Sequence, residues 1–240
     1  PAEPPTLDVV PPGASSARLT VLDTDGTLDE IGHLDGMGIG EQVQSVRFMD
    51  DLAYVVTFRQ IDPLYALDLS DPRAPRVLGE LKIPGFSEYL HPAGDGLLLG
   101  VGRQVDPGTG LDEGLKISLF DVSDPLAMTE VDQIVLANAW SNVSQDHKAF
   151  TWDPQRNRAV IPVEDGCGPD ADCDARGGAI VVAAAGAELD EVARITHGGT
   201  FGTGTPIRSV IVGDDLWTLS PLGLGRTDAD APGAVDLLVF

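Results

Sequence analysis

Short apolar runs recur along the chain, and polar turn residues separate them. The first clear set covers Val46–Phe48, Ala53–Phe58, Tyr65–Leu69 and Val77–Ile83. Runs of this length, rich in Val, Tyr, Phe and Leu with partial alternation, are typical of β-strands. The pattern therefore predicts four consecutive strands joined by short turns.

The same order of four runs returns three more times. The second set reads EYLHPAG, GLLLGVG, LKISLFDVS and MTEVDQIVL; the third reads KAFTWDP, RAVIPVE, AIVVAAA and LDEVARI; the fourth reads IRSVIVG, LWTLSPL, LGRTD and AVDLLVF. Repeated units of four antiparallel strands are the blades of a β-propeller. We therefore predict an all-β propeller of four-stranded antiparallel blades.

Two internal similarities support repeated blades. The segment Ala66–Leu81 and the segment Leu119–Ile134 both carry an apolar pair, an Asp and then Ser-Asp-Pro before a second alternating run. Gly38–Leu52 also aligns with Gly202–Leu216, with matches at two glycines, Ser-Val and Asp-Asp-Leu. We expect the carboxylates of Asp68 and Asp121 to accept backbone N–H groups at the turn between third and fourth strands.

The beginning of the chain predicts an incomplete blade. RLTVLDTDG and TLDEIGHLDG resemble a third and a fourth strand with no first or second strand before them. Residues 1–17 read as a Pro-rich linker or surface insertion, and residues 18–240 as propeller. This gives about four and a half blades, which we expect to be part of a larger ring. The missing strands would come from upstream sequence, another chain or the C-terminus of this chain.

The net charge of −23 makes nucleic acid a poor partner, because phosphate binding needs a basic surface. Such acidity is expected of a salt-loving host or of a high-GC genome, and it is compatible with a calcium-rich extracellular surface. The sequence contains no apolar run of the length that a membrane-spanning helix needs. Nucleic acid and a membrane span are therefore not expected.

The two cysteines, Cys167 and Cys173, lie in the polar loop EDGCGPDADCDARGG. A disulfide that closes this loop is our preferred interpretation, and it would indicate an oxidising compartment. The alternative is a pair of free thiols in a reducing cytosol. A metal site would need two further ligands that this spacing does not offer.

Three groups of polar residues are candidate sites. Asp23, Asp25 and Asp29 begin like a calcium loop, although a hairpin turn also needs Asp and Gly. Asp146 beside His147 could orient a general base at the channel mouth, although a structural hydrogen bond between blades is our preferred interpretation of the pair. Arg59, Gln60, Tyr89 and His91 lie in stretches that we expect to be inter-strand loops, where propellers place binding groups, so they are the binding candidates.

Known catalytic patterns give no support for an enzyme. The sequence has no Gly-x-Ser-x-Gly elbow, no phosphate-binding Gly-Lys-Ser/Thr loop and no dinucleotide fingerprint. The sequence therefore indicates no cofactor except possible calcium.

The segments SVRFMDDLAYVVTFRQIDPLYALDLSDPRAPRVLGELKIPGFSEYLHPAGDGLLLGVG, LKISLFDVSDP, DHKAF and IRSVIVGDDLWTLS resemble a secreted β-propeller family of bacteria and archaea, distantly related to WD-repeat proteins. The similarity runs from about Arg18 to the end and resembles the C-terminal half of that family's domain. It implies an exported or cell-surface protein and no established reaction. Two hypotheses follow: a non-catalytic scaffold that binds a protein, glycan or cell-envelope component, or an extracellular hydrolase or lyase with an acid/base site at the channel mouth.

Overall fold

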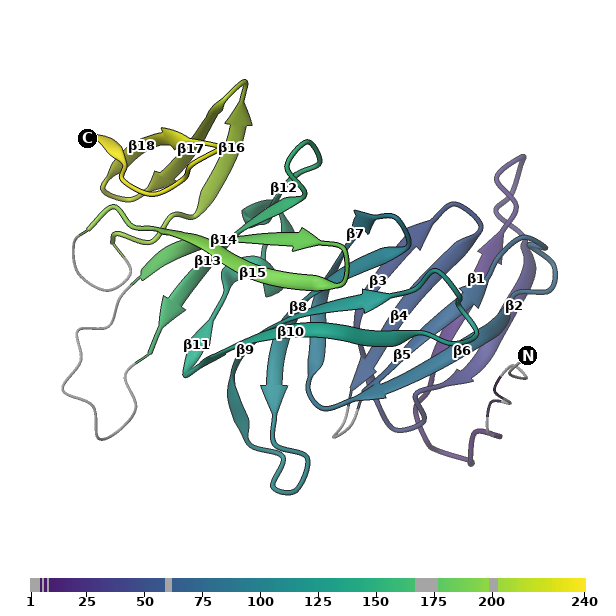
Figure 1. The fold of residues 1–240 in the computed structure, drawn as a ribbon. Helices are drawn as coiled ribbons and strands as arrows, with labels where there is room; N and C mark the ends of the chain where they lie inside the picture. Colours follow the sequence, from purple (N-terminus) through teal and green to yellow (C-terminus); the bar gives the residue numbers. More distant parts are fainter. Residues whose placement is uncertain (1–4, 6, 8, 59–61, 167–176, 199–202) are drawn as a thin grey trace.

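The computed structural model describes residues 5, 7, 9–58, 62–166, 177–198 and 203–240 of the chain. Its strands form five separate antiparallel sheets (Figure 1). Four of them are blades, and one is a two-stranded half blade. The prediction of an all-β propeller with four-stranded antiparallel blades is confirmed.

The half blade and the first two blades follow one another along the chain. The half blade pairs β1 (Ala17–Leu22) with β2 (Glu30–Met37). Blade 1 contains β3 (Gln42–Met49), β4 (Leu52–Phe58), β5 (Asp62–Asp68) and β6 (Arg76–Ile83). Blade 2 contains β7 (Phe86–Gly94), β8 (Leu97–Val105), β9 (Asp112–Asp121) and β10 (Thr129–Ala137).

Blades 3 and 4 complete the described part of the chain. Blade 3 contains β11 (Ala139–Trp140), β12 (Thr151–Asp153), β13 (Arg158–Asp165), β14 (Gly177–Ala185) and β15 (Glu188–Ile195). Blade 4 contains β16 (Arg208–Val212), β17 (Asp215–Ser220), β18 (Gly223–Asp228) and β19 (Asp236–Val239). All predicted four-strand sets have their counterparts here, including the segment LGRTD in β18.

The first strand of blade 3 differs from the prediction. The sequence suggested one strand over KAFTWDP, but the structure shortens it to β12, and β11, which was not predicted, pairs with β13 further upstream. Two 3₁₀ turns lie between them, η1 (Asn142–Ser144) and η2 (His147–Ala149). Ser141 Oγ accepts the N–H of Val143, and Asp146 Oδ1 accepts the N–H of Lys148. These side-chain bonds cap the two turns and replace the bonds that a continuous strand would make.

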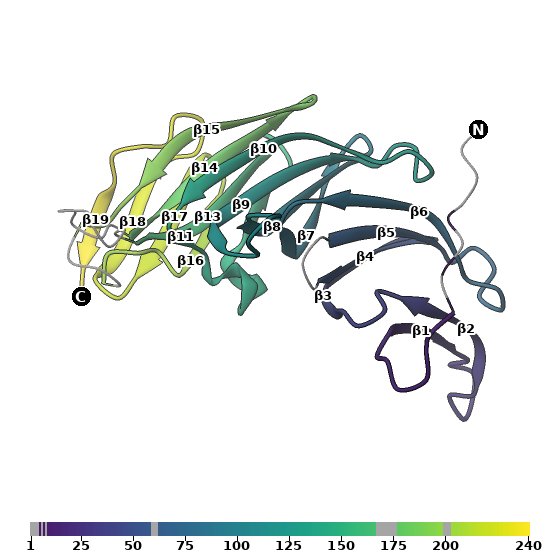
Figure 2. The same cartoon turned by 90° about the horizontal axis from the view of Figure 1, so that it is seen from below.

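The blades form an open arc, seen along its curve in Figure 2. The first strands β3, β7 and β16 follow the concave edge, and the fourth strands β6, β10 and β15 follow the convex edge. The half blade lies at one end and blade 4 at the other. Among the described strands, β1 pairs only with β2 and β19 only with β18. The C-terminus of this chain therefore does not supply the strands that the half blade lacks.

Apolar clusters fill the spaces between neighbouring blades. Tyr54 and Leu64 of blade 1 pack with Leu90 and Phe120 of blade 2, and all four are almost completely buried. The second strand β4 is buried along nearly its whole length because blades cover both of its faces. This burial explains why the second strands read as continuous apolar runs rather than as strict alternation.

The repeated Ser-Asp-Pro segments dock each blade on the one before it. Asp68 and Asp121 accept the backbone N–H of the residue two positions later, as predicted for this turn. The turns then place the carbonyl of Pro72 against Gly32 and the carbonyl of Pro125 against Gly79. A Cβ atom on these two glycines would lie 2.2 and 2.0 Å from those oxygens. The repeat therefore encodes a close contact between a turn and the fourth strand of the preceding blade.

No helix within the described ranges has the length and apolar character needed to cross a membrane.

Candidate functional site

An aromatic cluster lies along the concave edge, where blades 1, 2 and 3 meet. Tyr89 and His91 come from β7, the first strand of blade 2. His147 belongs to η2 of blade 3, Phe150 follows η2 directly, and Trp152 lies in β12. We call these residues, together with Arg47 from β3, the concave-edge cluster. Its members come from three sheets, so their proximity depends on how the blades dock.

Ring contacts connect the members of the cluster. The ring centroid of Tyr89 lies 4.8 Å from that of His147 and 4.9 Å from that of Phe150. The ring of His91 lies 4.8 Å from Phe150 and 5.5 Å from Trp152. All four pairs are tilted, a geometry that aromatic rings favour. The rings therefore form one continuous row across the boundary between blades 2 and 3, in which Phe150 is buried in the apolar core.

His91 is the polar centre of this row of rings. Its Nδ1 lies 3.0 Å from the Tyr89 hydroxyl and 3.5 Å from Arg47 Nη2. Burial, and then the positive charge of Arg47, lower the pKa of His91 to about 4. Burial also raises the pKa of Tyr89. At neutral pH His91 is therefore uncharged, and Arg47 is the cation of this group.

A pocket adjoins the cluster between blades 3 and 4. It has a volume of about 440 Å³ and is lined by Trp152, Thr151 and Gln155 on one side and by Val210 and Asp214 on the other. Thr151 Oγ1 donates to the carbonyl of Ser209 at 2.8 Å, which ties the two first strands together. Volumes of this size are typical of small-molecule sites. Trp152 thus lines a pocket and also contacts His91 of the cluster.

The proposed acid/base pair is arranged differently from the prediction. Asp146 accepts the N–H of Lys148 and the guanidinium of Arg208, and the bond to the Lys148 N–H is the main reason that its pKa is lowered. Among the hydrogen bonds of the described ranges, neither oxygen of Asp146 contacts His147. The His147 ring packs on Tyr89 instead. The geometry thus gives Asp146 the role of a cap and of a link to blade 4.

The sequence also matches a known protein family. A family model described as a beta propeller domain matches residues 8–231. The chain belongs to this beta-propeller family. The prediction of a propeller family is confirmed, while its secreted character and its distant relation to WD-repeat proteins remain predictions.

Two archaeal proteins of similar sequence are described as uncharacterised. MJ1554 of Methanocaldococcus jannaschii is 46% identical over 146 residues, which are 60% of this chain and 22% of that protein. A protein of Archaeoglobus fulgidus is 42% identical over 138 residues, 58% of this chain and 21% of that protein. The aligned region thus spans about a fifth of the length of these relatives.

Among solved structures, the N-terminal domain of Nup159 is 13% identical, with a TM-score of 0.28 over 90% of this chain and 69% of that one. Nup159 in a complex from S. cerevisiae is also 13% identical, with a TM-score of 0.28 over 91% of this chain and 68% of that one. A TM-score this low carries no argument about function.

The other predicted binding residues have different outcomes. Tyr89 and His91 lie inside β7, so their placement in an inter-strand loop was wrong, because the strand runs from Phe86 to Gly94. Arg59 and Gln60 lie outside the described residues. The cysteine pair, Cys167 and Cys173, also lies outside them, so the disulfide remains a prediction.

Sequence reasoning missed three members of the cluster: Arg47, Phe150 and Trp152. One signal was available for Arg47. In the alignment of Gly38–Leu52 with Gly202–Leu216, Arg47 stands where blade 4 has the apolar Ile211. A cation at a position that another blade fills with an apolar residue indicates a local polar role.

The candidate calcium residues form a hairpin turn between β1 and β2. Asp23 Oδ1 accepts the N–H of Asp25 at 2.9 Å, and Asp29 accepts the hydroxyl of Thr27 at 2.6 Å. Within the described ranges, no three His, Cys, Asp or Glu side chains gather as a metal site would require. Calcium binding by this family member stays a prediction, and the turn itself is explained by the hydrogen bonds of its aspartates.

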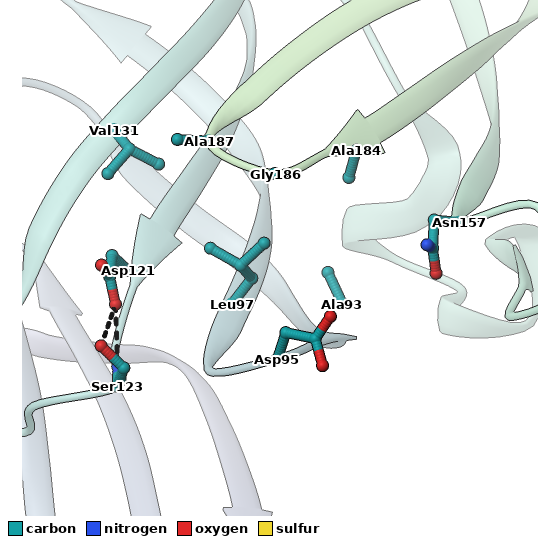
Figure 3. Close-up of a pocket in the computed structure, with 10 residues that line it drawn as sticks. All are labelled: Ala93, Asp95, Leu97, Asp121, Ser123, Val131, Asn157, Ala184, Gly186 and Ala187. Carbon is teal, nitrogen blue, oxygen red and sulfur yellow. Dashed lines mark hydrogen bonds between the residues drawn. The ribbon is translucent and has the colours of Figure 1, made fainter.

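A second pocket, of about 230 Å³, lies between blades 2 and 3 (Figure 3). Asp95, Asp121 and Asn157 line it together with apolar residues such as Leu97 and Ala184. Figure 3 shows the two hydrogen bonds from Ser123 to Asp121 at its rim. That carboxylate and the Ser123 hydroxyl already serve the turn, so Asp95 and Asn157 are the remaining polar side chains of this pocket.

Proposed function

We propose that this beta-propeller is an exported or cell-surface scaffold that binds a cell-envelope component without catalysis. The concave-edge cluster is the observation that carries this proposal. It combines aromatic faces, a cation and an adjoining pocket, which are the features of a recognition site. The acid/base alternative is less well supported, since Asp146 is bound to Lys148 and Arg208 rather than to His147.

Co-sedimentation of the purified chain with cell-envelope preparations tests the binding role. We expect binding that Trp152→Ala weakens, because this residue lines the pocket and contacts His91. Trp217→Ala is the matched control, since Trp217 contacts Arg226 in blade 4. Equal loss with both variants, or release of cleaved envelope saccharides that His147→Ala abolishes, would contradict the proposal.

The location has its own test. Protease treatment of intact cells that produce the whole protein should remove the propeller if the protein is exported to the cell surface. Full protection until the cells are lysed would contradict a surface location.

We also propose that two strands from upstream sequence pair with β1 and complete the half blade. Val46 and Phe48 of β3 pair with Val55 and Ala53, which belong to the apolar cluster that packs against β1 and β2. Val46 is nevertheless 44% exposed and Phe48 62% exposed. Two inner strands beside β1 would cover this surface and the free strand edge. Hydrogen exchange of the β1 amides should slow in the whole protein relative to this chain, and unchanged exchange would argue against completion.

A further inference from the structure

Arg47 holds no ion pair with a carboxylate, and among the arginines of the described ranges it shares this with Arg73, which is exposed, and with Arg158, which donates to the carbonyls of Ala229 and Asp230. In a chain with a net charge of −23, most of the described arginines hold an ion pair. The arginines paired with carboxylates are Arg18, Arg76, Arg103, Arg156, Arg194, Arg208 and Arg226. Arg47 is half-buried, and its contact in the described part of the chain is His91 Nδ1 at 3.5 Å.

That single contact leaves most of the guanidinium unused. Arg carries five N–H donors in a planar fork that matches the two oxygens of a carboxylate. His91 can accept only one hydrogen bond through Nδ1, and the Tyr89 hydroxyl lies closer to the same atom, at 3.0 Å. The remaining donors of Arg47 are therefore available for an anion at the concave edge.

The neighbouring surface favours a ring-shaped ligand. From Arg47, a row of aromatic rings continues through His91 to Trp152, with 5.5 Å between the last two centroids. Beyond Trp152 lies the pocket of about 440 Å³, whose polar lining consists of the Gln155 amide, the carboxylates of Asp153 and Asp214, and the Thr151 hydroxyl, which is already bonded to Ser209. An aromatic face packs well against the C–H face of a sugar, while nearby polar groups can bind its hydroxyls.

We propose that the concave-edge cluster binds a saccharide with one carboxylate, its acid group on Arg47 and a sugar ring against Trp152. This inference rests on the proposed binding role and specifies its ligand class. The charge of the chain favours a ligand with few carboxylates, because a polyanion would be repelled by the protein as a whole. At physiological ionic strength, salt screens the repulsion between the ligand carboxylate and acidic groups of the protein that lie more than about 8 Å away. The direct contact between this carboxylate and Arg47 is much shorter and therefore persists.

The test is calorimetric titration of the purified chain with a disaccharide that ends in glucuronic acid and with its neutral glucose counterpart. We expect the acidic disaccharide to bind more tightly. Arg47→Gln should weaken acidic binding by about tenfold or more, because a charged hydrogen bond is lost. It should leave binding of the neutral sugar nearly unchanged. Arg73→Gln is the matched control, since Arg73 is an exposed arginine of the Ser-Asp-Pro turn.

Trp152→Phe should weaken both sugars, and Trp217→Phe neither. Circular dichroism and melting temperature establish that each variant is folded. Several results would overturn the inference: no binding of the acidic disaccharide, equal binding of the neutral one, equal loss with Arg73→Gln, or tighter binding of 3-phenylpropionate than of the sugar acid. If envelope binding through Trp152 persists in any of these cases, only the ligand class is wrong. If envelope binding is also absent, the scaffold proposal fails as well.

Discussion

Replacing Gly79 with alanine should destabilise the contact between blades 1 and 2. Gly79 lies in β6 and faces the Ser-Asp-Pro turn of blade 2. An added Cβ would lie 2.0 Å from the carbonyl oxygen of Pro125 and 3.2 Å from its carbon. Both are backbone atoms, so no side-chain rotation can relieve the overlap, and the turn or the strand must shift.

The expected cost follows from two opposing effects. Overpacking of a close contact destabilises a protein by about 1–3 kcal/mol. Loss of glycine flexibility in the unfolded chain returns about 0.4–1 kcal/mol. The overlap at 2.0 Å involves backbone atoms, so the upper end of the first range applies and the net loss should be about 2 kcal/mol. Each kcal/mol lowers the melting temperature by about 2–4 °C in a protein of this size.

Urea unfolding followed by circular dichroism measures this loss. Gly26→Ala is the matched control, because a Cβ at Gly26 would meet no atom within 4 Å. It should leave stability unchanged or slightly raised. Equal stability of Gly79→Ala and Gly26→Ala would refute the idea that the repeated turn fixes neighbouring blades by close backbone contact.

Three further predictions concern charge. Lys116 is 3% exposed, pairs with Glu130 at 2.9 Å and donates to the carbonyl of Pro84. Lys116→Met should therefore lower the free energy of unfolding, measured with urea, by about 3–5 kcal/mol. Adding Glu130→Leu should restore part of this loss, because it removes the unpaired carboxylate. A double variant as unstable as Lys116→Met would contradict a pairing effect. Burial and Arg47 lower the pKa of His91 to about 4, so the unfolded chain, with a value near 6.5, binds more protons between these limits. The stability due to neutral His91 is thus present above pH 6.5 and lost as the pH falls toward 4. The urea unfolding midpoints of the native protein and of His91→Gln should therefore converge as the pH falls through this window. Midpoints that stay the same distance apart at every pH would contradict a contribution from neutral His91. Finally, the melting temperature should rise from low to high KCl because salt screens the self-repulsion of a chain with net charge −23, and a constant or falling value would show that this repulsion is unimportant.

The sequence was sufficient to predict the blades because each strand carries its own local pattern. Alternation and turn residues located β4 to β6 closely and only the middle of β3, and the repeated Ser-Asp-Pro located the turns after β5 and β9. The interruption between β11 and β12 was not predicted, since it depends on side-chain caps from Ser141 and Asp146 that compete with strand bonding.

The candidate site was predictable only in part. Tyr89, His91 and His147 were recognised as candidates, but their mutual contacts were not. The cluster forms because three separate sheets dock with one particular spacing, and the Ser-Asp-Pro repeat indicates contacts only at the fourth strands, on the opposite edge from the cluster. Trp152 therefore became visible as a site residue only in three dimensions, and Arg47 was indicated in the sequence only by its alignment with the apolar Ile211.

Mapping the ligand on the labelled chain by NMR tests the concave-edge site most directly. Titration with the glucuronic-acid disaccharide should shift the backbone and side-chain signals of Arg47, His91 and Trp152 first, with smaller changes at Gln155. Shifts that centre on the half blade or on the pocket around Asp95, with the signals of Arg47 and Trp152 unmoved, would contradict a binding site on the concave edge.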